Sequence, residues 1–139
     1  PKEYSEALLD AHKYAIEKGM SIKNASTGKF ECLRTVFCGA VGIPNWTVTC
    51  DGRVTSCTRD NMPEEFSFGK FDEKTGKVLL DETKVERLRN MSVFTFPECQ
   101  NCFCKYNCAG DCPDLRLAKM LNCDATRKVG AYILNKKFE

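Results

Sequence analysis

Eight of the ten cysteines in the chain are spaced as two sets of four metal ligands. These eight are Cys32, Cys38, Cys57, Cys99, Cys102, Cys108, Cys112 and Cys123. Five of the ten fall within residues 99–112, where a pair such as Cys99-x2-Cys102 is suited to wrapping one ion or cluster. The cysteine spacing therefore predicts a metal-binding protein.

An even number of cysteines also permits a set of disulfide bonds. Disulfide frameworks are most typical of secreted chains shorter than about 80 residues, whereas this chain has 139. The crowding of cysteines between Cys99 and Cys112 favours metal ligation further. We therefore prefer metal to disulfides.

Zinc and iron–sulfur clusters are the two metal alternatives. Structural zinc sites also use C-x2-C pairs, but the only histidine, His12, lies far from the cysteines in the sequence, so two all-cysteine zinc sites would be needed. The segment Cys99-x2-Cys102-x5-Cys108-x3-Cys112-Pro113 ends in the C-x3-C-P arrangement of bacterial ferredoxins, whose last cysteine ligates the other cluster of a pair. Spacing alone favours iron–sulfur and leaves open a two-zinc, all-cysteine structural or interaction module without redox function.

The complete order of cysteines is similar to a family signature. It runs Cys38-x13-Gly52-x4-Cys57, a long gap, Cys99-x2-Cys102-x5-Cys108-x3-Cys112, a second gap and then Cys123. This order resembles the SPASM domain, the C-terminal auxiliary-cluster domain of radical SAM enzymes that modify peptides and proteins. Cys32 resembles the additional ligand of members whose first auxiliary cluster is fully coordinated by protein.

The resemblance implies two 4Fe–4S clusters with interleaved ligands. The first quartet is Cys32, Cys38, Cys57 and Cys112, and the second quartet is Cys99, Cys102, Cys108 and Cys123. It also implies electron transfer and substrate positioning during post-translational modification of a peptide or protein. With four cysteines for each cluster, no iron is expected to stay open for substrate ligation, which favours electron relay over substrate anchoring.

The chain departs from the family's full enzymes in one respect. Radical SAM chemistry needs a C-x3-C-x2-C loop that leaves one iron open for S-adenosylmethionine, and this sequence contains none. Its nearest approach, Cys104-x3-Cys108-x3-Cys112, has the wrong second interval. We therefore expect a piece of a larger enzyme, with S-adenosylmethionine, a third cluster and the catalytic barrel outside this segment and no activity in the segment alone.

Bulk composition limits the other partners. The 21 basic and 19 acidic residues are scattered and leave a net charge of +2, which does not form the basic stripe that nucleic acid requires. No apolar run approaches the roughly 18 residues of a membrane span. We expect a cytoplasmic protein without a nucleic-acid or membrane partner, whose partners are the barrel of the parent chain and a peptide or protein substrate.

The pattern around Asp51-Gly52 predicts a β-hairpin over about residues 46–57, because this dipeptide suits a two-residue turn. In that register Cys50 lies opposite Arg53, and Trp46 lies beside Cys57. Cys50 is then too far along the strand to share a cluster with Cys57, and we expect it to be a small buried hydrophobic residue.

Cys104 lies in the spacer between Cys102 and Cys108, where the family has no ligand. We expect a free or packed thiol there. The alternative is that Cys104 binds metal together with Cys102 as a C-x-C pair. Phe94, Phe96 and Phe103 flank the cysteine run and are expected in the core.

A second hairpin is expected from residues 66–71 and 77–80, followed by a helix that Asp81 caps and that turns Val85 and Leu88 inward. An N-terminal helix over residues 4–18 would bury one face. That face consists of Leu8, Ala11, Ala15 and Ile16.

Two further helices are expected over residues 114–121 and 125–135, the second capped by Asp124, with Lys128, Lys136 and Lys137 on a solvated face. The fold class is α+β: a small cluster-organised domain of two hairpins and several short helices, preceded by the N-terminal helix. Residues 1–28 would be helix and linker from the missing barrel, and residues 29–139 the SPASM-like domain.

Overall fold

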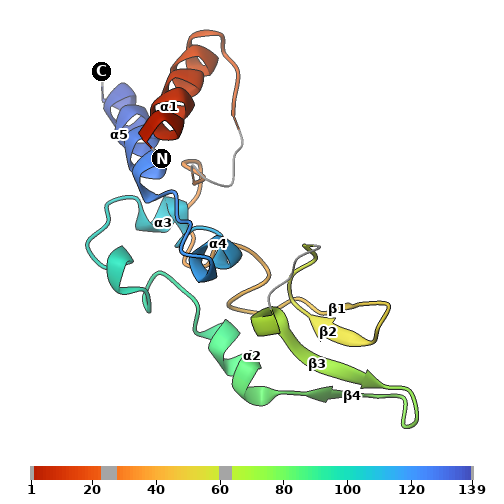
Figure 1. The fold of residues 1–139 in the computed structure, drawn as a ribbon. Helices are drawn as coiled ribbons and strands as arrows, with labels where there is room; N and C mark the ends of the chain where they lie inside the picture. The colour runs from red at the N-terminus through yellow and green to blue at the C-terminus, as the bar shows by residue number, and fades with distance from the viewer. Residues whose placement is uncertain (1, 23–27, 60–63, 139) are drawn as a thin grey trace.

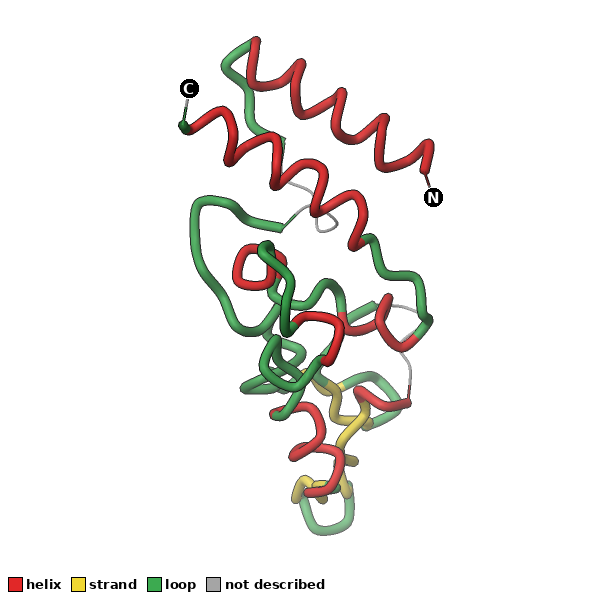
Figure 2. The backbone as a smooth tube through the Cα atoms, turned by 90° about the vertical axis from the view of Figure 1, so that its left-hand side faces the viewer, coloured by secondary structure: helices red, strands yellow, loops and turns green. Residues whose placement is uncertain are grey.

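The computed structural model describes residues 2–22, 28–59 and 64–138. Two long helices lie side by side at one end, a small sheet with one helix forms the other end, and short helices and loops lie between them (Figure 1). Figure 2 shows the same order of layers from the side. The α+β class predicted from the sequence is confirmed.

Four antiparallel strands form one sheet in the order β1-β2-β3-β4. The strands are β1 (Thr47–Val48), β2 (Arg53–Thr55), β3 (Ser67–Asp72) and β4 (Lys77–Leu80). Both predicted hairpins are present, and pairing of β2 with β3 joins them. The sheet fixes the chain on both sides of Cys57, which follows β2.

The register of the first hairpin differs from the prediction by one residue. Thr47 lies opposite Thr55 and Val48 opposite Val54. A two-residue turn of this kind would need positive φ at both Asp51 and Gly52, but only Gly52 has it, at 78°. The turn is longer, and the Gly52 N–H donates to the Thr49 carbonyl at 2.9 Å. A turn closed by one left-handed residue is the alternative to a two-residue turn with both central residues at positive φ.

The slipped register changes the surroundings of two predicted neighbours. Trp46 is 59% exposed and meets the Phe68 ring edge-on at 6.0 Å between ring centroids. Cys57 packs partly buried against the core formed around Val54 and Phe66. The expected contact of Cys57 with the indole is therefore wrong.

The sheet and α2 (Glu82–Arg89) enclose the main core. Its fully buried members include Val54, Phe66, Phe68 and Leu88. The predicted cap is confirmed, since the Asp81 carboxylate accepts a hydrogen bond from the Lys84 N–H at 3.1 Å, and Val85 and Leu88 face inward. This core anchors the loop that carries Cys38, because Val41 belongs to it.

The long helices α1 (Lys2–Glu17) and α5 (Cys123–Lys137) pack together through Leu8, Ala125 and Val129. Asp124 does not cap α5: its carboxylate accepts a hydrogen bond from the Ser5 hydroxyl at 2.6 Å, and Asn122 is the N-cap residue. Polar contacts of Lys128 reinforce the pair.

Lys128 pairs with Glu6 of α1 and with Asp124, the latter at 3.3 Å. Lys136 and Lys137 are exposed as predicted, and the Lys128 side chain is 27% exposed. Lys128 ties the last helix to the first.

Short helices occupy the middle of the molecule. They are η3 (Pro97–Cys99), α3 (Lys105–Cys108) and α4 (Pro113–Leu117), whereas η2 (Glu64–Phe66) lies at the sheet end and leads into β3. Pro113 opens α4 as expected, but the helix ends at Leu117 rather than 121. Among the described residues, no helix has the length and apolar character needed to cross a membrane.

The buried face of α1 differs from the predicted face. Leu8 and Ala15 are buried as expected, but Ala11 and Ile16 are exposed, and Ser5 and His12 take their places. His12 is 6% exposed, and its Nε2 atom has no hydrogen-bond partner within the described part of the chain. Burial therefore lowers the pKa of His12.

This burial predicts a pH effect on stability. The unfolded state has an ordinary histidine pKa of about 6.5, and the folded pKa lies below it. Between these values the unfolded state binds more protons, so stability falls as the pH drops below about 6.5. We expect the urea midpoint of the native chain to fall between pH 7.5 and 5.5, and His12→Phe to fall less. An equal fall in both proteins would contradict this account.

Candidate metal centre

The predicted ligands come from loops and helix ends on both sides of the molecule's middle. Cys38 precedes the sheet and Cys57 follows β2, whereas Cys112 is the N-cap residue of α4. Cys99 ends η3, Cys108 ends α3 and Cys123 begins α5. Backbone geometry at each end therefore sets where the thiols point.

Three thiols of the first quartet lie close enough to interact electrostatically. Burial raises the pKa of Cys38, and Cys112 and Cys57 raise it further, while Arg34 lowers it. The fold thus brings Cys38, Cys57 and Cys112 together from distant parts of the sequence. Cys32 is exposed, and the described contacts do not include its thiol in this group.

The other three thiols of the second quartet all lie near Cys123. Burial raises the pKa of Cys123, and Cys102 acts on it in the same direction. Cys123 in turn raises the pKa of Cys99 and of Cys108, which are both shifted mainly by burial, Cys108 to about 11. Metal binding by this group stays a prediction, since burial and proximity of thiols alone do not identify the ion.

The two groups meet at the turn between Cys108 and Cys112. Ala109, Gly110 and Asp111 all have positive φ, of 57°, 88° and 65°. Non-glycine residues adopt this region at a cost of about 1–2 kcal/mol each. At Gly110 any side chain would also collide with Phe96, whose ring would lie 2.8 Å from an added Cβ. The turn reverses the chain so that neighbouring thiols can face different groups.

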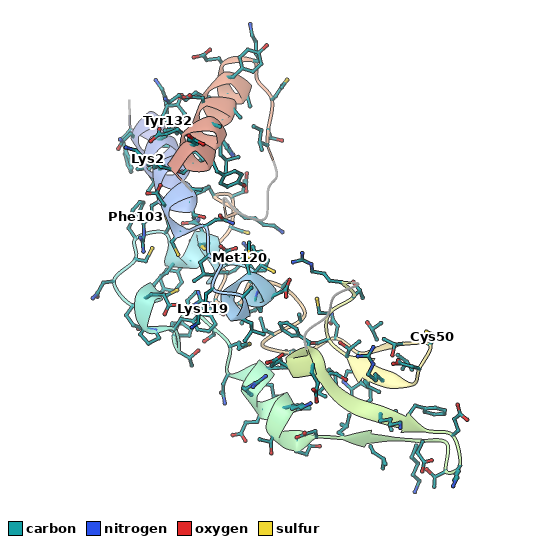
Figure 3. The ribbon with its side chains drawn as sticks, viewed as in Figure 1. Lys2, Cys50, Phe103, Lys119, Met120 and Tyr132 are labelled. Atoms are coloured by element: carbon teal, nitrogen blue, oxygen red, sulfur yellow. The ribbon has the colours of Figure 1, made fainter. Side chains whose placement is uncertain are left out.

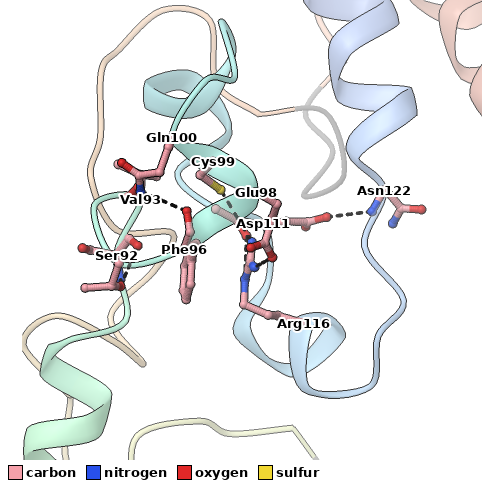
Figure 4. A network of polar contacts seen from close by, with 11 residues as sticks. Ser92, Val93, Phe96, Glu98, Cys99, Gln100, Asp111, Arg116 and Asn122 are labelled. Carbon is pink, nitrogen blue, oxygen red and sulfur yellow. Dashed lines mark hydrogen bonds and ion pairs between the residues drawn. The ribbon is translucent and has the colours of Figure 1, made fainter.

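Asp111 holds this turn in place. Its side chain is buried, and one carboxylate oxygen accepts from the Cys112 N–H at 2.6 Å. The other oxygen accepts from the Asn122 N–H at 3.0 Å (Figure 4). One carboxylate thereby fixes the backbone at Cys112 and at the residue before Cys123.

Arg116 is the second residue that organises this region. Its side chain is 11% exposed and pairs with Glu98. Its Nη2 donates to the Cys99 sulfur at 3.8 Å, and its Nε donates to the Gly110 carbonyl at 3.2 Å (Figure 4). The guanidinium also lies 3.7 Å from the centre of the Phe96 ring. A single cation therefore joins the Cys99 loop to the 108–112 turn.

Two more arginines approach the thiols. Arg34 donates to the carbonyl of Asn107 at 3.0 Å, which links the loop before Cys38 to α3. A hydrogen bond to Cys102 raises the pKa of Arg127. Sequence reasoning did not single out these arginines or Asp111, because charged residues in loops carry no periodic signal that predicts burial.

The two remaining cysteines lie in different environments. Cys104 is 1% exposed, its thiol lies 3.8 Å from the Thr126 carbonyl, and burial raises its pKa to about 12. It is a packed thiol, as expected. Cys50 is exposed at the turn end of the first hairpin (Figure 3), so its predicted burial is wrong. It lines a shallow hollow together with Cys57.

The aromatic residues beside the cysteine run are less buried than expected. Phe94 is 61% exposed and Phe103 is 56% exposed, the latter on the loop before α3 (Figure 3). Only Phe96 is partly buried, beneath Arg116. The predicted core positions of Phe94 and Phe103 are therefore wrong.

A cavity of about 860 Å³ lies next to the first group of thiols. Its walls include Ile16, Phe30, Phe37 and Ile133, with Cys32 and Cys38 on one side. His12 also lines it and supplies the buried Nε2 atom without a described partner. The cavity is thus mainly apolar, and its wall also carries His12 and the charged residues Lys29, Glu31, Arg34 and Lys137.

The donor set fits iron–sulfur clusters. Within the described ranges, no three His, Cys, Asp or Glu side chains stand close enough to hold one metal ion. Sulfur-only groups flanked by arginines match the thiolate ligation of such clusters.

These features define a small α+β protein with a cysteine-rich metal centre. The family model for SPASM, the iron–sulfur cluster-binding domain, matches residues 38–113. The chain belongs to this family. The match covers six of the eight predicted ligands, all except Cys32 and Cys123. No curated protein and no solved structure matches the chain.

The environments of Cys50 and Cys104 predict opposite reactivity toward iodoacetamide. We expect Cys50 to be alkylated rapidly in the native, metal-loaded chain, whereas burial and a pKa of about 12 leave Cys104 almost without thiolate. Peptide mass spectrometry after timed quenching measures both, and unfolding with a chelator should equalise them. Equal native rates would contradict the packing of Cys104, and metal-dependent protection of Cys50 would make it a ligand.

Proposed function

We propose that the chain is an auxiliary 4Fe–4S domain of a radical SAM enzyme that modifies a peptide or protein. The match to the SPASM iron–sulfur cluster-binding domain carries the proposal, and the neighbourhoods of the thiols support it. Cys112 lies with Cys38 and Cys57, whereas its near neighbour Cys108 lies with Cys123. Paired, interleaved ligand sets are typical of two-cluster ferredoxin-like sites.

Electron relay is the role that we assign to the clusters, since 4Fe–4S clusters supply one-electron redox chemistry when bound. The residues of this chain would hold the clusters and limit access to them. Cys32, Cys38, Cys57 and Cys112 would hold one, and Cys99, Cys102, Cys108 and Cys123 the other. Four thiolates for each cluster would leave no iron open to a substrate.

Substrate positioning is the second role, and the cavity beside Cys32 and Cys38 supports it. Its apolar walls suit an apolar side chain of a peptide, and the Nε2 atom of His12 could hydrogen-bond a peptide group. The proposed partners are the catalytic barrel of the parent chain and the peptide or protein substrate. The proposed location is the cytoplasm, where thiols stay reduced.

Metal analysis tests the proposal directly. After anaerobic purification and reconstitution we expect a brown protein with about eight irons and about eight sulfides per chain, the content of two 4Fe–4S clusters. Iron, sulfide and zinc assays together with electron paramagnetic resonance (EPR) of the reduced protein measure this. A colourless protein that retains about two zinc ions would overturn the proposal.

Substitution of Cys112 tests the crossed arrangement. We expect Cys112→Ala and Cys57→Ala to perturb the same cluster signal, and the double variant to lose no more than either single variant. Cys108→Ala should perturb the other signal. The measurements are iron content and EPR spectra of the reduced chain. If Cys112→Ala and Cys108→Ala perturb one and the same centre, the assignment is wrong.

A further inference from the structure

We propose that Arg116 and Glu98 form an opposed charge pair that sets the reduction potential of the cluster on the second quartet. Arg116 would raise the potential and Glu98 would lower it. The inference rests on the proposed function, since it requires a cluster held by Cys99 and its partners. It assigns positioning and electrostatic roles to two residues outside the ligand set.

The first support is the position of the guanidinium. Arg116 is held on several sides, by the Glu98 carboxylate, the Gly110 carbonyl and the Phe96 ring. These three partners leave the guanidinium little freedom. Its Nη2 donates to the Gly110 carbonyl at 2.5 Å and also lies 3.8 Å from the Cys99 sulfur. The cation is therefore preorganised at one ligand of the second quartet.

The second support is burial. The Arg116 side chain is 11% exposed, so water and salt screen its charge much less than that of a surface arginine. Hydrogen bonds to sulfur, net charge and solvent exposure are the terms through which a protein sets the potential of a cluster. One-electron reduction adds negative charge, and a nearby fixed cation stabilises the reduced form.

The third support is the set of opposing charges. Glu98 precedes the ligand Cys99, and its carboxylate forms an ion pair with the Arg116 guanidinium. The negative charge of Asp111 also raises the pKa of Cys108 and of Cys123. Removal of Arg116 would thus leave the cluster facing two carboxylates, and removal of Glu98 would leave the cation opposed by Asp111 alone.

Arg127 provides an internal comparison. Arg127 hydrogen-bonds Cys102 of the same quartet, but Arg127 is exposed to solvent. Solvent screening should make its influence smaller than that of Arg116. A graded effect of Arg116 and Arg127 is what electrostatic control predicts.

The test is a redox titration of the reconstituted full chain with dithionite as electron donor, followed by EPR. The variants are Arg116→Gln, Glu98→Gln, their double variant and Arg127→Gln. Arg53→Gln is the matched control, because Arg53 also forms an ion pair, with Asp51 at 2.8 Å, but lies in the hairpin. Iron and sulfide contents of all variants are measured in parallel.

We expect Arg116→Gln to lower the reduced-to-oxidised ratio of one cluster at fixed potential by tenfold or more, which is about 59 mV for a one-electron couple. Glu98→Gln should shift the same cluster in the opposite direction, and the double variant should lie between them. Arg127→Gln should give a smaller negative shift, and Arg53→Gln none. Opposite shifts in potential would indicate an electrostatic role. If the two residues had only a structural role, both substitutions would weaken cluster binding and neither would shift the potential in a direction set by its charge.

The outcomes distinguish this inference from the function on which it rests. Normal iron and sulfide contents with unmoved potentials in Arg116→Gln and Glu98→Gln would overturn the inference and leave the proposed function intact. If Arg116→Gln does not assemble clusters, the predicted positive shift in Glu98→Gln still decides the matter. A wild-type chain without clusters would overturn both.

Discussion

The turn between Cys108 and Cys112 is the constraint on which the rest of the site depends. Three consecutive residues with positive φ reverse the chain between Cys108, an electrostatic neighbour of Cys123, and Cys112, an electrostatic neighbour of Cys38. Ala109 and Asp111 adopt this conformation at a cost, and such strain persists only where surrounding contacts determine it. Asp111 and Arg116 supply those contacts.

The polar contacts around the turn link three parts of the fold. Asp111 reaches the start of α5, Arg116 reaches the Cys99 loop, and Arg34 reaches α3 from the loop before the sheet. The thiols that they surround have raised pKa values where burial dominates, as at Cys108 and Cys123. Metal binding must therefore displace protons, and the free energy of ligation contributes to folding.

Much of the local structure could be predicted from the sequence. Asp81 at a helix start, Val85 and Leu88 on one helix face, and the two hairpins follow from capping and periodicity, which act over a few residues. The cysteine spacing also indicated the family. The errors concern strand register and side-chain exposure. The first hairpin pairs one residue away from the predicted register, and Cys50 is exposed rather than buried.

The sequence by itself determined which atoms can bind metal, because thiol type and spacing are covalent properties of the chain. Only the tertiary structure decided which thiols meet, since contacts between Cys38 and Cys112 depend on how the sheet, the 108–112 turn and α5 pack. It also decided that His12 is buried beside the cavity and that Arg116 is enclosed. Burial of a polar residue depends on long-range packing, and no local pattern of residues encodes it.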